Sequence, residues 1–254
     1  MASHSDPWYF EFFKRDYLPS YDHTFTRERV EREVALVERA LGLRPGHRVL
    51  DLCCGPRRHA VALARHGIRV TGQDLNASYL DMVHETAEAE GLPLETVQSD
   101  MRRIPFEAEF DNVINMFTSF GYLETEDDDQ EVLRQVARAL KPSGRFLLDT
   151  VNREWVVSNY IQNEWREDPD GTVYLEHRDL DLLTSRNHVS FTVIAPDGTR
   201  RESVGHKARL YTLTEMARML ANAGPALEHT YGGFEGEPYG VATRRMILVA
   251  RKGE

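Results

Sequence analysis

Residues 49–59 read VLDLCCGPRRH, and this stretch decides the fold. A short apolar run carries one acidic residue, Asp51, and a turn of small residues follows it before a helical pattern begins. The same alternation of strand and helix patterns recurs as far as residue 151. Because strands that alternate with helices form βαβ units, the sequence predicts a doubly wound α/β domain, with helices on both faces of a parallel sheet.

The elements of this domain follow from apolar runs and the turn residues between them. Strands are predicted at His47–Leu52, Ile68–Gly72, Leu94–Gln98, Phe110–Phe117 and Arg145–Val151. One predicted helix begins at Thr26, and two more cover Val61–Ala64 and Ser78–Glu90. In a fourth, Val132, Val136 and Leu140 fall on one face, and Lys141-Pro142-Ser143-Gly144 ends the helix.

The pattern changes after about residue 165, where shorter alternating runs replace the strand–helix units. Strands are predicted at Thr172–Leu182, His188–Ile194 and Thr199–Tyr211, and Pro196-Asp197-Gly198 is a hairpin turn signal. Thr212 and Glu215 form a capping box that opens a helix, and strands near Leu227–Tyr231 and Met246–Ala250 complete the chain. Residues 165–211 are therefore predicted to be an antiparallel β-meander inserted into one domain.

Composition limits the partners and the compartment. The 254 residues carry 31 Lys and Arg against 41 Asp and Glu, a net charge of −10, and no basic block longer than a pair. This acidity gives no general attraction for nucleic acid or an anionic membrane. The two cysteines are adjacent, which excludes a disulfide framework and zinc-finger spacing. No leader pattern and no long apolar stretch is visible, so we expect a cytoplasmic protein.

The first 25 residues are unusually aromatic, and we interpret them as a segment that caps the core. The aromatic side chains are Trp8, Tyr9, Phe10, Phe12, Phe13, Tyr17, Tyr21 and Phe25.

Acidic residues follow three successive predicted strands, at the edge where ligands bind in doubly wound sheets. Asp74 ends the second strand and can accept hydrogen bonds from both hydroxyls of a ribose. Asp100 follows the third strand and can accept from an adenine amine, with Met101 lying against the base. The small residues Cys53–Gly55 let a ligand approach the backbone. Together these features predict a nucleoside site.

A dinucleotide site is the rival hypothesis for these residues. It requires Gly-x-Gly-x-x-Gly, and those positions hold Cys53, Gly55 and Arg58, so two of three fail. A P-loop and a Gly-x-Ser-x-Gly nucleophile turn are both absent from the sequence.

Over nearly its full length the chain resembles the class I S-adenosylmethionine-dependent methyltransferases. Asp51, Cys53 and Gly55 match the first motif of that family, Asp74 matches its ribose acid, and Asp100-Met101 its adenine contact. Leu140–Arg145 is similar to the family's turn before strand five, with Ser143 in a usual glycine position. Ile114–Leu123 resembles small-molecule enzymes, including N,N-dimethyltransferases of nucleotide-linked aminosugars, which carry an aromatic lid and a β-meander.

The resemblance implies a seven-stranded Rossmann-like sheet whose last strand is antiparallel, an aromatic N-terminal lid over residues 1–25, and a methyltransferase domain over residues 26–254. It implies S-adenosyl-L-methionine as cofactor and S-adenosyl-L-homocysteine as product. The implied cofactor-binding residues are Tyr21 on the lid, Asp51, Cys53, Cys54, Gly55, Asp74, Leu75, Asp100, Met101, Arg102, Asn115 and Phe117.

One position departs from the family's pattern, because Arg57 stands where the third small residue of the first motif belongs. If that backbone is left-handed, a non-glycine residue costs about 1–2 kcal/mol. The side chain either swings outward, pairs with the cofactor carboxylate or blocks the site. The last outcome leads to the alternative function, a protein that binds the cofactor or its product but has lost or repurposed methyl transfer.

The acceptor is expected to be a small molecule with a nitrogen or oxygen nucleophile, because the net charge and Asn115-Met116-Phe117 do not suit DNA, RNA or protein. An oxygen nucleophile needs a base, whereas an amine needs only to be neutral. His23 and Tyr122 are our candidate catalytic residues, with His59, His188 and His206 more readily explained as structural.

The remaining functional signals are weak. Residues 231–240 form a long glycine-rich loop that we expect near the pocket mouth. Asp127-Asp128-Asp129 precedes a helix, so we interpret it as capping and expect no metal site. A homodimer is left open.

Overall fold

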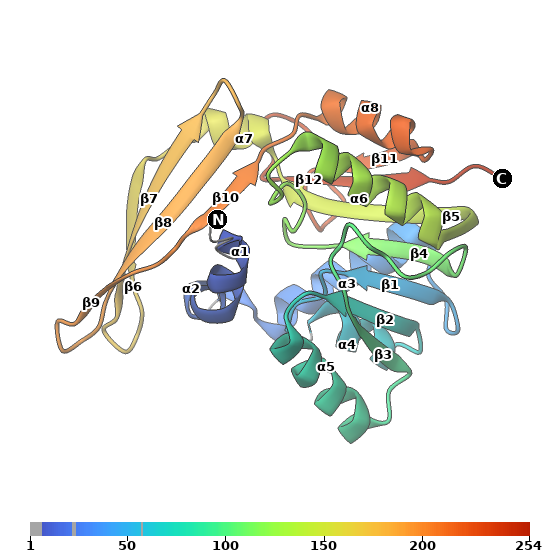
Figure 1. Cartoon of the computed structure of the whole chain (residues 1–254), viewed down its shortest axis with the longest axis horizontal. Coiled ribbons are helices and arrows are strands. Elements are labelled where there is room, and N and C mark those ends of the chain that lie inside the picture. The colour runs from blue at the N-terminus through green and yellow to red at the C-terminus, as the bar shows by residue number, and fades with distance from the viewer. Residues whose placement is uncertain (1–6, 22–23, 57) are drawn as a thin grey trace, which may run out of the picture.

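A computed structural model describes residues 7–21, 24–56 and 58–254, and its centre is a seven-stranded sheet (Figure 1). The strand order is β11-β12-β5-β4-β1-β2-β3. Neighbouring strands from β1 to β5 are parallel, whereas β12 is antiparallel to both β5 and β11. The strands cover Arg48–Leu52 (β1), Arg69–Asp74 (β2), Leu94–Gln98 (β3), Phe110–Asn115 (β4), Leu140–Val151 (β5), Ala226–Tyr231 (β11) and Arg245–Arg251 (β12). The predicted fold class is confirmed.

Helices cover both faces of this sheet. One face carries α3 (Arg27–Leu41), α4 (His59–Arg65) and α5 (Ala77–Glu90), and the other carries α6 (Glu126–Ala139) and α8 (Leu213–Ala223). Alternation along β5 supplies both cores, since Leu147 packs with the first group while Phe146 and Leu148 pack with the second.

The ends of α3 and α8 follow the predicted signals, whereas α6 begins at Glu126, so that Asp127, Asp128 and Asp129 lie in its first turn and do not precede it. Thr26 caps α3 by accepting from the Arg29 N–H, and Gly42 ends that helix with a φ of 62°. Thr212 and Glu215 form the predicted capping box of α8.

Several strand boundaries differ from the prediction, and two of these differences are informative. Leu140 belongs to β5 and not to α6, which ends at Ala139, although Leu140 is fully buried in the same core that its helical phase predicted. At the other boundary, β4 ends at Asn115 and not at Phe117, because Phe117 has a φ of 61°, a value outside the strand region.

A second, antiparallel sheet follows the main one, and it forms the predicted meander. Its order is β10-β8-β7-β6, with β9 also paired to β8. After helix α7 (Arg153–Ser158), its strands are β6 (Asn163–Glu167), β7 (Val173–Asp181), β8 (Arg186–Ile194), β9 (Arg200–Glu202) and β10 (His206–Arg209).

The prediction missed one strand of this sheet and merged two others. Strand β6 is short, charged and mostly exposed, so it lacks the apolar alternation that reveals a strand. The single strand predicted at Thr199–Tyr211 is broken between β9 and β10. At the break, Gly205 has a φ of 67°, and an added Cβ would lie 2.1 Å from the Val189 carbonyl oxygen.

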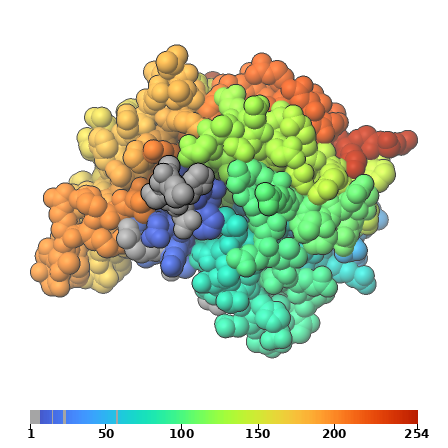
Figure 2. All heavy atoms as spheres, in the orientation of Figure 1, coloured from blue at the N-terminus to red at the C-terminus, as the bar shows by residue number. Residues whose placement is uncertain are grey.

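The N-terminal helices lie between the second sheet and the α/β domain, as the blue segments of Figures 1 and 2 show. They are α1 (Trp8–Glu11), a π-helix η1 (Phe12–Asp16) and α2 (Tyr17–Tyr21). Phe12 and Tyr17 pack with Tyr79 of α5 and with Val189 and Phe191 of β8. These helices belong to the lid predicted over residues 1–25. Residues 1–6, 22 and 23 of that predicted segment lie outside the described residues.

Polar contacts fasten these helices to the second sheet. The Asp16 carboxylate accepts from the Val204 N–H at 3.1 Å and from the Arg201 guanidinium, and Arg166 donates to the Ser20 carbonyl oxygen at 3.0 Å. Within the described residues, no helix is both long and apolar enough to cross a membrane.

One buried carboxyl gives the fold a pH dependence. Asp129 lies in the first turn of α6, is fully buried, and accepts from the Tyr211 hydroxyl at 2.7 Å. Burial raises the pKa of Asp129 to about 7, even though the Tyr211 hydrogen bond and the Arg186 charge lower it.

We predict that the free energy of unfolding falls as pH rises from about 4 to about 7, by up to about 1.4 kcal/mol per pH unit from Asp129. The sign follows because a raised pKa makes the folded state hold the proton that the unfolded state has released. Asp129→Asn removes this contribution. Urea unfolding of both proteins between pH 5 and 8 measures it, and parallel stability curves would contradict the prediction.

Candidate functional site

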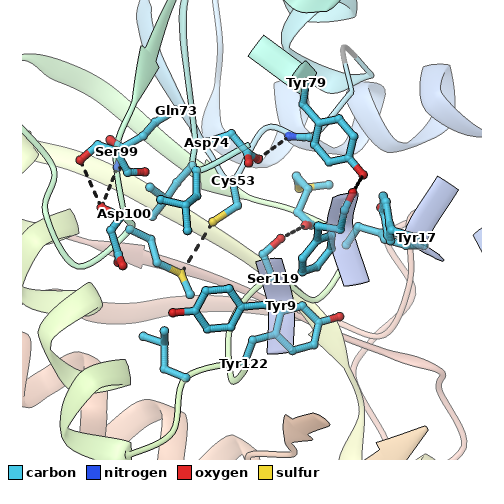
Figure 3. A pocket seen from close by; sticks show the side chains of 18 of the residues that line it. Tyr9, Tyr17, Cys53, Gln73, Asp74, Tyr79, Ser99, Asp100, Ser119 and Tyr122 are labelled. Atoms are coloured by element: carbon cyan, nitrogen blue, oxygen red, sulfur yellow. Dashed lines mark hydrogen bonds between the residues drawn. The ribbon is translucent and has the colours of Figure 1, made fainter. Parts of the chain in front are cut away.

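A cavity lies at the carboxyl ends of β1, β2, β3 and β4, beneath the N-terminal helices (Figure 3). This is the edge where the strand order reverses, since β1 pairs with β2 on one side and β4 on the other. The lining residues come from four strand ends and from the lid: Tyr9, Phe13, Tyr17, Leu52, Cys53, Gly55, Arg58, Gln73, Asp74, Leu75, Tyr79, Ser99, Asp100, Met101, Met116, Phe117, Ser119, Tyr122 and Leu123.

The turn after β1 forms the floor of the cavity. Cys53 and Gly55 both have a φ of 59°. The left-handed backbone considered for Arg57 in the sequence is therefore present at Cys53, another non-glycine residue of the motif. Arg57 itself lies outside the described residues. Cys54 turns away from the cavity and packs against Gly72, where an added Cβ would lie 3.0 Å from its Sγ. Cys53 therefore lines the cavity, whereas Cys54 supports the turn from behind.

Asp74 ties the end of β2 to this turn. Its Oδ2 accepts from the Gly55 N–H and its Oδ1 from the Asn76 N–H, both at 2.9 Å. Burial raises the pKa of Asp74, although these backbone hydrogen bonds act in the opposite direction. The carboxylate lines the cavity beside Leu75, where the prediction placed a ribose contact.

Asp100 is held in place at the end of β3. Its two oxygens accept from Arg102 Nε at 3.0 Å and Nη2 at 2.7 Å, and Arg102 also reaches Asp128 at 3.1 Å. Burial alone would raise the pKa of Asp100, but the hydrogen bonds and charge of Arg102 outweigh it and lower the pKa. Arg102 thus fixes an ionised Asp100 and does not itself line the cavity.

Arg58 is a positively charged residue of the cavity wall. The sequence did not indicate this role, since Arg58 only occupied a glycine position of the dinucleotide motif that the chain lacks. Its Nη2 donates to the Tyr17 hydroxyl at 3.1 Å, and its guanidinium lies 3.8 Å from the centre of the Phe25 ring and 4.7 Å from that of Phe117. Its buried Nε and Nη1 have no hydrogen-bond partner in the part of the chain that the structure describes. Two donors are therefore free for an anionic ligand.

Asp51 and Asn115 lie on the strands that lead into the cavity and do not line it. Both are buried, and Asn115 donates to the Leu52 carbonyl oxygen at 2.8 Å. Burial raises the pKa of Asp51 to about 6. One oxygen of each side chain, Asp51 Oδ2 and Asn115 Oδ1, is unpartnered among the described residues.

The opposite wall is aromatic. Tyr9 of α1 and Tyr122, which follows β4, both line the cavity with Asp74 and Asp100 (Figure 3). Burial raises the pKa of Tyr122 and raises that of Tyr17 to about 12. These phenols are therefore protonated donors at neutral pH.

Tyr21 does not line this cavity, although the resemblance placed it near the cofactor. Its hydroxyl shares a 2.8 Å hydrogen bond with Nε2 of His206 on β10, and its ring packs against Phe117 and Phe191. Burial lowers the pKa of His206 to about 3, so this histidine is neutral. The lid contributes Tyr9, Phe13 and Tyr17 to the cavity in place of Tyr21.

The other sequence candidates that the structure describes are not among the residues that line the cavity. His59 is buried against Glu33 of α3 at 2.6 Å, and His188 lies on β8. The 231–240 loop closes on itself through a hydrogen bond from the Gly232 N–H to the Glu237 carbonyl oxygen. His23, our candidate catalytic histidine, lies outside the described residues. Within the described chain no cluster of three His, Cys, Asp or Glu side chains could hold a metal ion.

Comparisons with known proteins agree with this geometry. A family model described as a methyltransferase domain matches residues 49–144. The putative methyltransferase YqeM of Bacillus subtilis is 28% identical over 210 residues, which are 82% of this chain and 85% of that protein. Residues 49–144 therefore resemble a methyltransferase domain, and most of the chain is similar to a putative methyltransferase.

Two solved structures show the same fold as this chain. The CcbJ methyltransferase from Streptomyces caelestis has a TM-score of 0.78 at 24% identity, covering 88% of this chain and 90% of its own. CalS10 from Micromonospora echinaspora, an amino pentose methyltransferase solved with S-adenosylmethionine bound, has a TM-score of 0.70 at 19% identity and covers 93% and 96%.

The side chains that line the cavity fit S-adenosylmethionine, the cofactor that the sequence resemblance implies. Arg58 and Gln73 line the cavity with Asp74 and Asp100, and each has a buried polar atom without a partner among the described residues. S-adenosylmethionine joins an amino acid to a nucleoside. Its carboxylate requires a positively charged donor such as Arg58, and its ribose and adenine require acceptors such as Asp74 and Asp100.

Proposed function

We propose that this chain transfers a methyl group from S-adenosylmethionine to the amine nitrogen of a small molecule. The observation that carries the proposal is the lining of the cavity. It combines the Asp74 and Asp100 carboxylates, two donor nitrogens of Arg58 that have no partner among the described residues, and several aromatic rings. The fold shared with CalS10, an amino pentose methyltransferase, supports the same choice.

The cofactor residues follow from the groups at each strand end. Asp74 would accept from the ribose hydroxyls, and Asp100 and Met101 would contact the adenine. Arg58 would pair with the methionine carboxylate through Nε and Nη1, and the Cys53–Gly55 turn would let the backbone come close. Bound there, the cofactor supplies a methyl group on a positively charged sulfur.

A nitrogen acceptor is favoured because the phenols and the thiol of the described cavity residues are protonated and so cannot act as a base. The sulfur of the cofactor links its ribose to its methionine part, so the reaction takes place between Asp74 and Arg58. The nearby phenols and the Cys53 thiol hold their protons, because burial raises their pKa values. A hydroxyl acceptor would require a base, whereas a neutral amine requires none.

The aromatic wall can stabilise the positive charge that moves from the sulfur of the cofactor to the acceptor nitrogen during methyl transfer. The faces of Phe117, Tyr122 and Tyr17 carry negative potential and stabilise a cation. They also exclude water, which keeps the amine and the methyl group aligned. The chain's contribution is therefore alignment, charge stabilisation and water exclusion, and the acceptor brings its own electron pair.

The first prediction concerns cofactor binding. Arg58→Met should weaken S-adenosylhomocysteine binding about tenfold to hundredfold, because a charge-assisted hydrogen bond contributes about 1.5–3 kcal/mol. Binding of 5′-methylthioadenosine, which lacks the carboxylate, should be unchanged, and calorimetry measures both. Equal losses for the two ligands would mean that Arg58 only supports the fold, and no loss for either would exclude it as the carboxylate partner.

The second prediction concerns the nucleophile. With an aminosugar acceptor, kcat/KM should rise tenfold per pH unit up to the pKa of the acceptor's own amine and then level off. An acceptor whose amine has a lower pKa should shift the break by the same amount. The matched sugar with a hydroxyl in place of the amine should not be methylated. A break at one fixed pH for every acceptor, or methylation of the hydroxyl sugar, would contradict the proposal.

A further inference from the structure

The turn after β4 has an unfavourable backbone. Phe117 and Thr118 have φ values of 61° and 62°, and no other two neighbouring non-glycine residues of the described chain are both left-handed. Phenylalanine and β-branched threonine are poorly suited to this region, since Cβ crowds the following carbonyl group. Such a conformation persists only where surrounding contacts hold it.

Asp149, near the end of β5, provides those contacts. Its Oδ2 accepts from the Phe117 N–H at 2.9 Å, and its backbone carbonyl oxygen accepts from the Thr118 N–H at 3.0 Å. Both N–H groups of the strained turn are therefore bound to one residue. Asp149 is 1% exposed, so water cannot replace it.

Arg245, the first residue of β12, completes the arrangement. Its Nε donates to Asp149 Oδ1 at 2.7 Å and its Nη2 donates to Thr118 Oγ1 at 3.1 Å. The guanidinium thus compensates the buried carboxylate and binds the turn directly. Turn, carboxylate and guanidinium form a closed ring of hydrogen bonds across β4, β5 and β12.

The turn determines where the Phe117 ring lies. This ring lines the cavity, packs edge-on against Phe25 with 5.3 Å between ring centres, and lies 4.7 Å from the Arg58 guanidinium. In a relaxed turn the Phe117 side chain would leave the Cα in another direction. Neither Asp149 nor Arg245 lines the cavity, and both are hydrogen-bonded to the turn that carries Phe117.

We propose that Asp149 and Arg245 are positioning residues, which hold the 117–118 turn in its left-handed conformation and so fix Phe117 against the cofactor and Arg58. The inference rests on the proposed function in one respect, since its main readout is the binding of S-adenosylhomocysteine. A purely structural role, in which the pair only joins β5 to β12, would lower stability and leave affinity unchanged.

The test compares Asp149→Asn and Arg245→Lys with a matched control. Asp149→Asn keeps the shape of the side chain but turns amide donors toward Arg245, and the ammonium introduced by Arg245→Lys cannot donate to Asp149 and Thr118 in the same geometry. Each variant should bind S-adenosylhomocysteine at least tenfold more weakly by calorimetry. Glu228→Gln breaks another ion pair of the same sheet, to Arg145 at 2.7 Å, and should leave the affinity unchanged.

Rescue distinguishes positioning from support. Thr118→Gly added to Asp149→Asn should restore most of the lost affinity, because glycine adopts a left-handed backbone without strain. Unchanged affinity in Asp149→Asn and Arg245→Lys would overturn the proposal. So would a loss of affinity that Thr118→Gly does not reduce.

A crystal structure of Asp149→Asn without ligand gives a readout that does not depend on cofactor binding. The 117–118 turn should leave the left-handed region and the Phe117 ring should move, whereas an unchanged turn would refute the positioning role. If the wild-type protein itself binds no S-adenosylhomocysteine, the proposed function fails, and this structure still decides the role of Asp149 and Arg245.

Discussion

The parallel register that β1 shares with β2 and β4 is the constraint on which the site depends. It brings Asp51 level with Gly72 on one side and Ile114 on the other, so three strands end together at one edge. The Gly55 N–H then reaches Asp74, and Asn115 reaches the Leu52 carbonyl oxygen, which joins the loops that leave those strands. This register therefore positions Asp74 beside the turn that follows β1.

A second layer closes the cavity from above, and it comes from distant parts of the chain. The N-terminal helices contact the second sheet through Asp16, Ser20 and Tyr21, and they contact the α/β domain through the Phe13 carbonyl oxygen, which accepts from Tyr79. The rings of Tyr9, Phe13 and Tyr17 therefore lie over the strand ends. We infer that the lid and the meander serve one purpose, to make a dry aromatic space for the acceptor beside the cofactor.

The sequence predicted the features that depend on local patterns. Strand and helix order, the capping box at Thr212, and Asp74 and Asp100 at strand ends all follow from short-range spacing, and the structure has them. It could not predict which lid tyrosine faces the cavity, since Tyr17 and Tyr21 lie on one short helix and differ through distant contacts, Tyr17 with Arg58 and Tyr21 with His206. The sequence shows Arg58 only as a residue that replaces a glycine of the dinucleotide motif. Its role as a donor in the cavity depends on its contacts with Tyr17, Phe25 and Phe117, which only the folded chain brings together. The left-handed Phe117–Thr118 turn lacks any glycine or asparagine signal, and its cause lies in β5 and β12.

A crystal structure with S-adenosylhomocysteine bound tests the central claim most directly, that this cavity is a methyl-transfer site. The account predicts adenine beside Asp100 and Met101, ribose hydroxyls on Asp74, the carboxylate on Arg58, and the sulfur facing Phe117 and Tyr122. Binding outside the cavity would contradict it, as would a reversed orientation that places the adenine at Arg58.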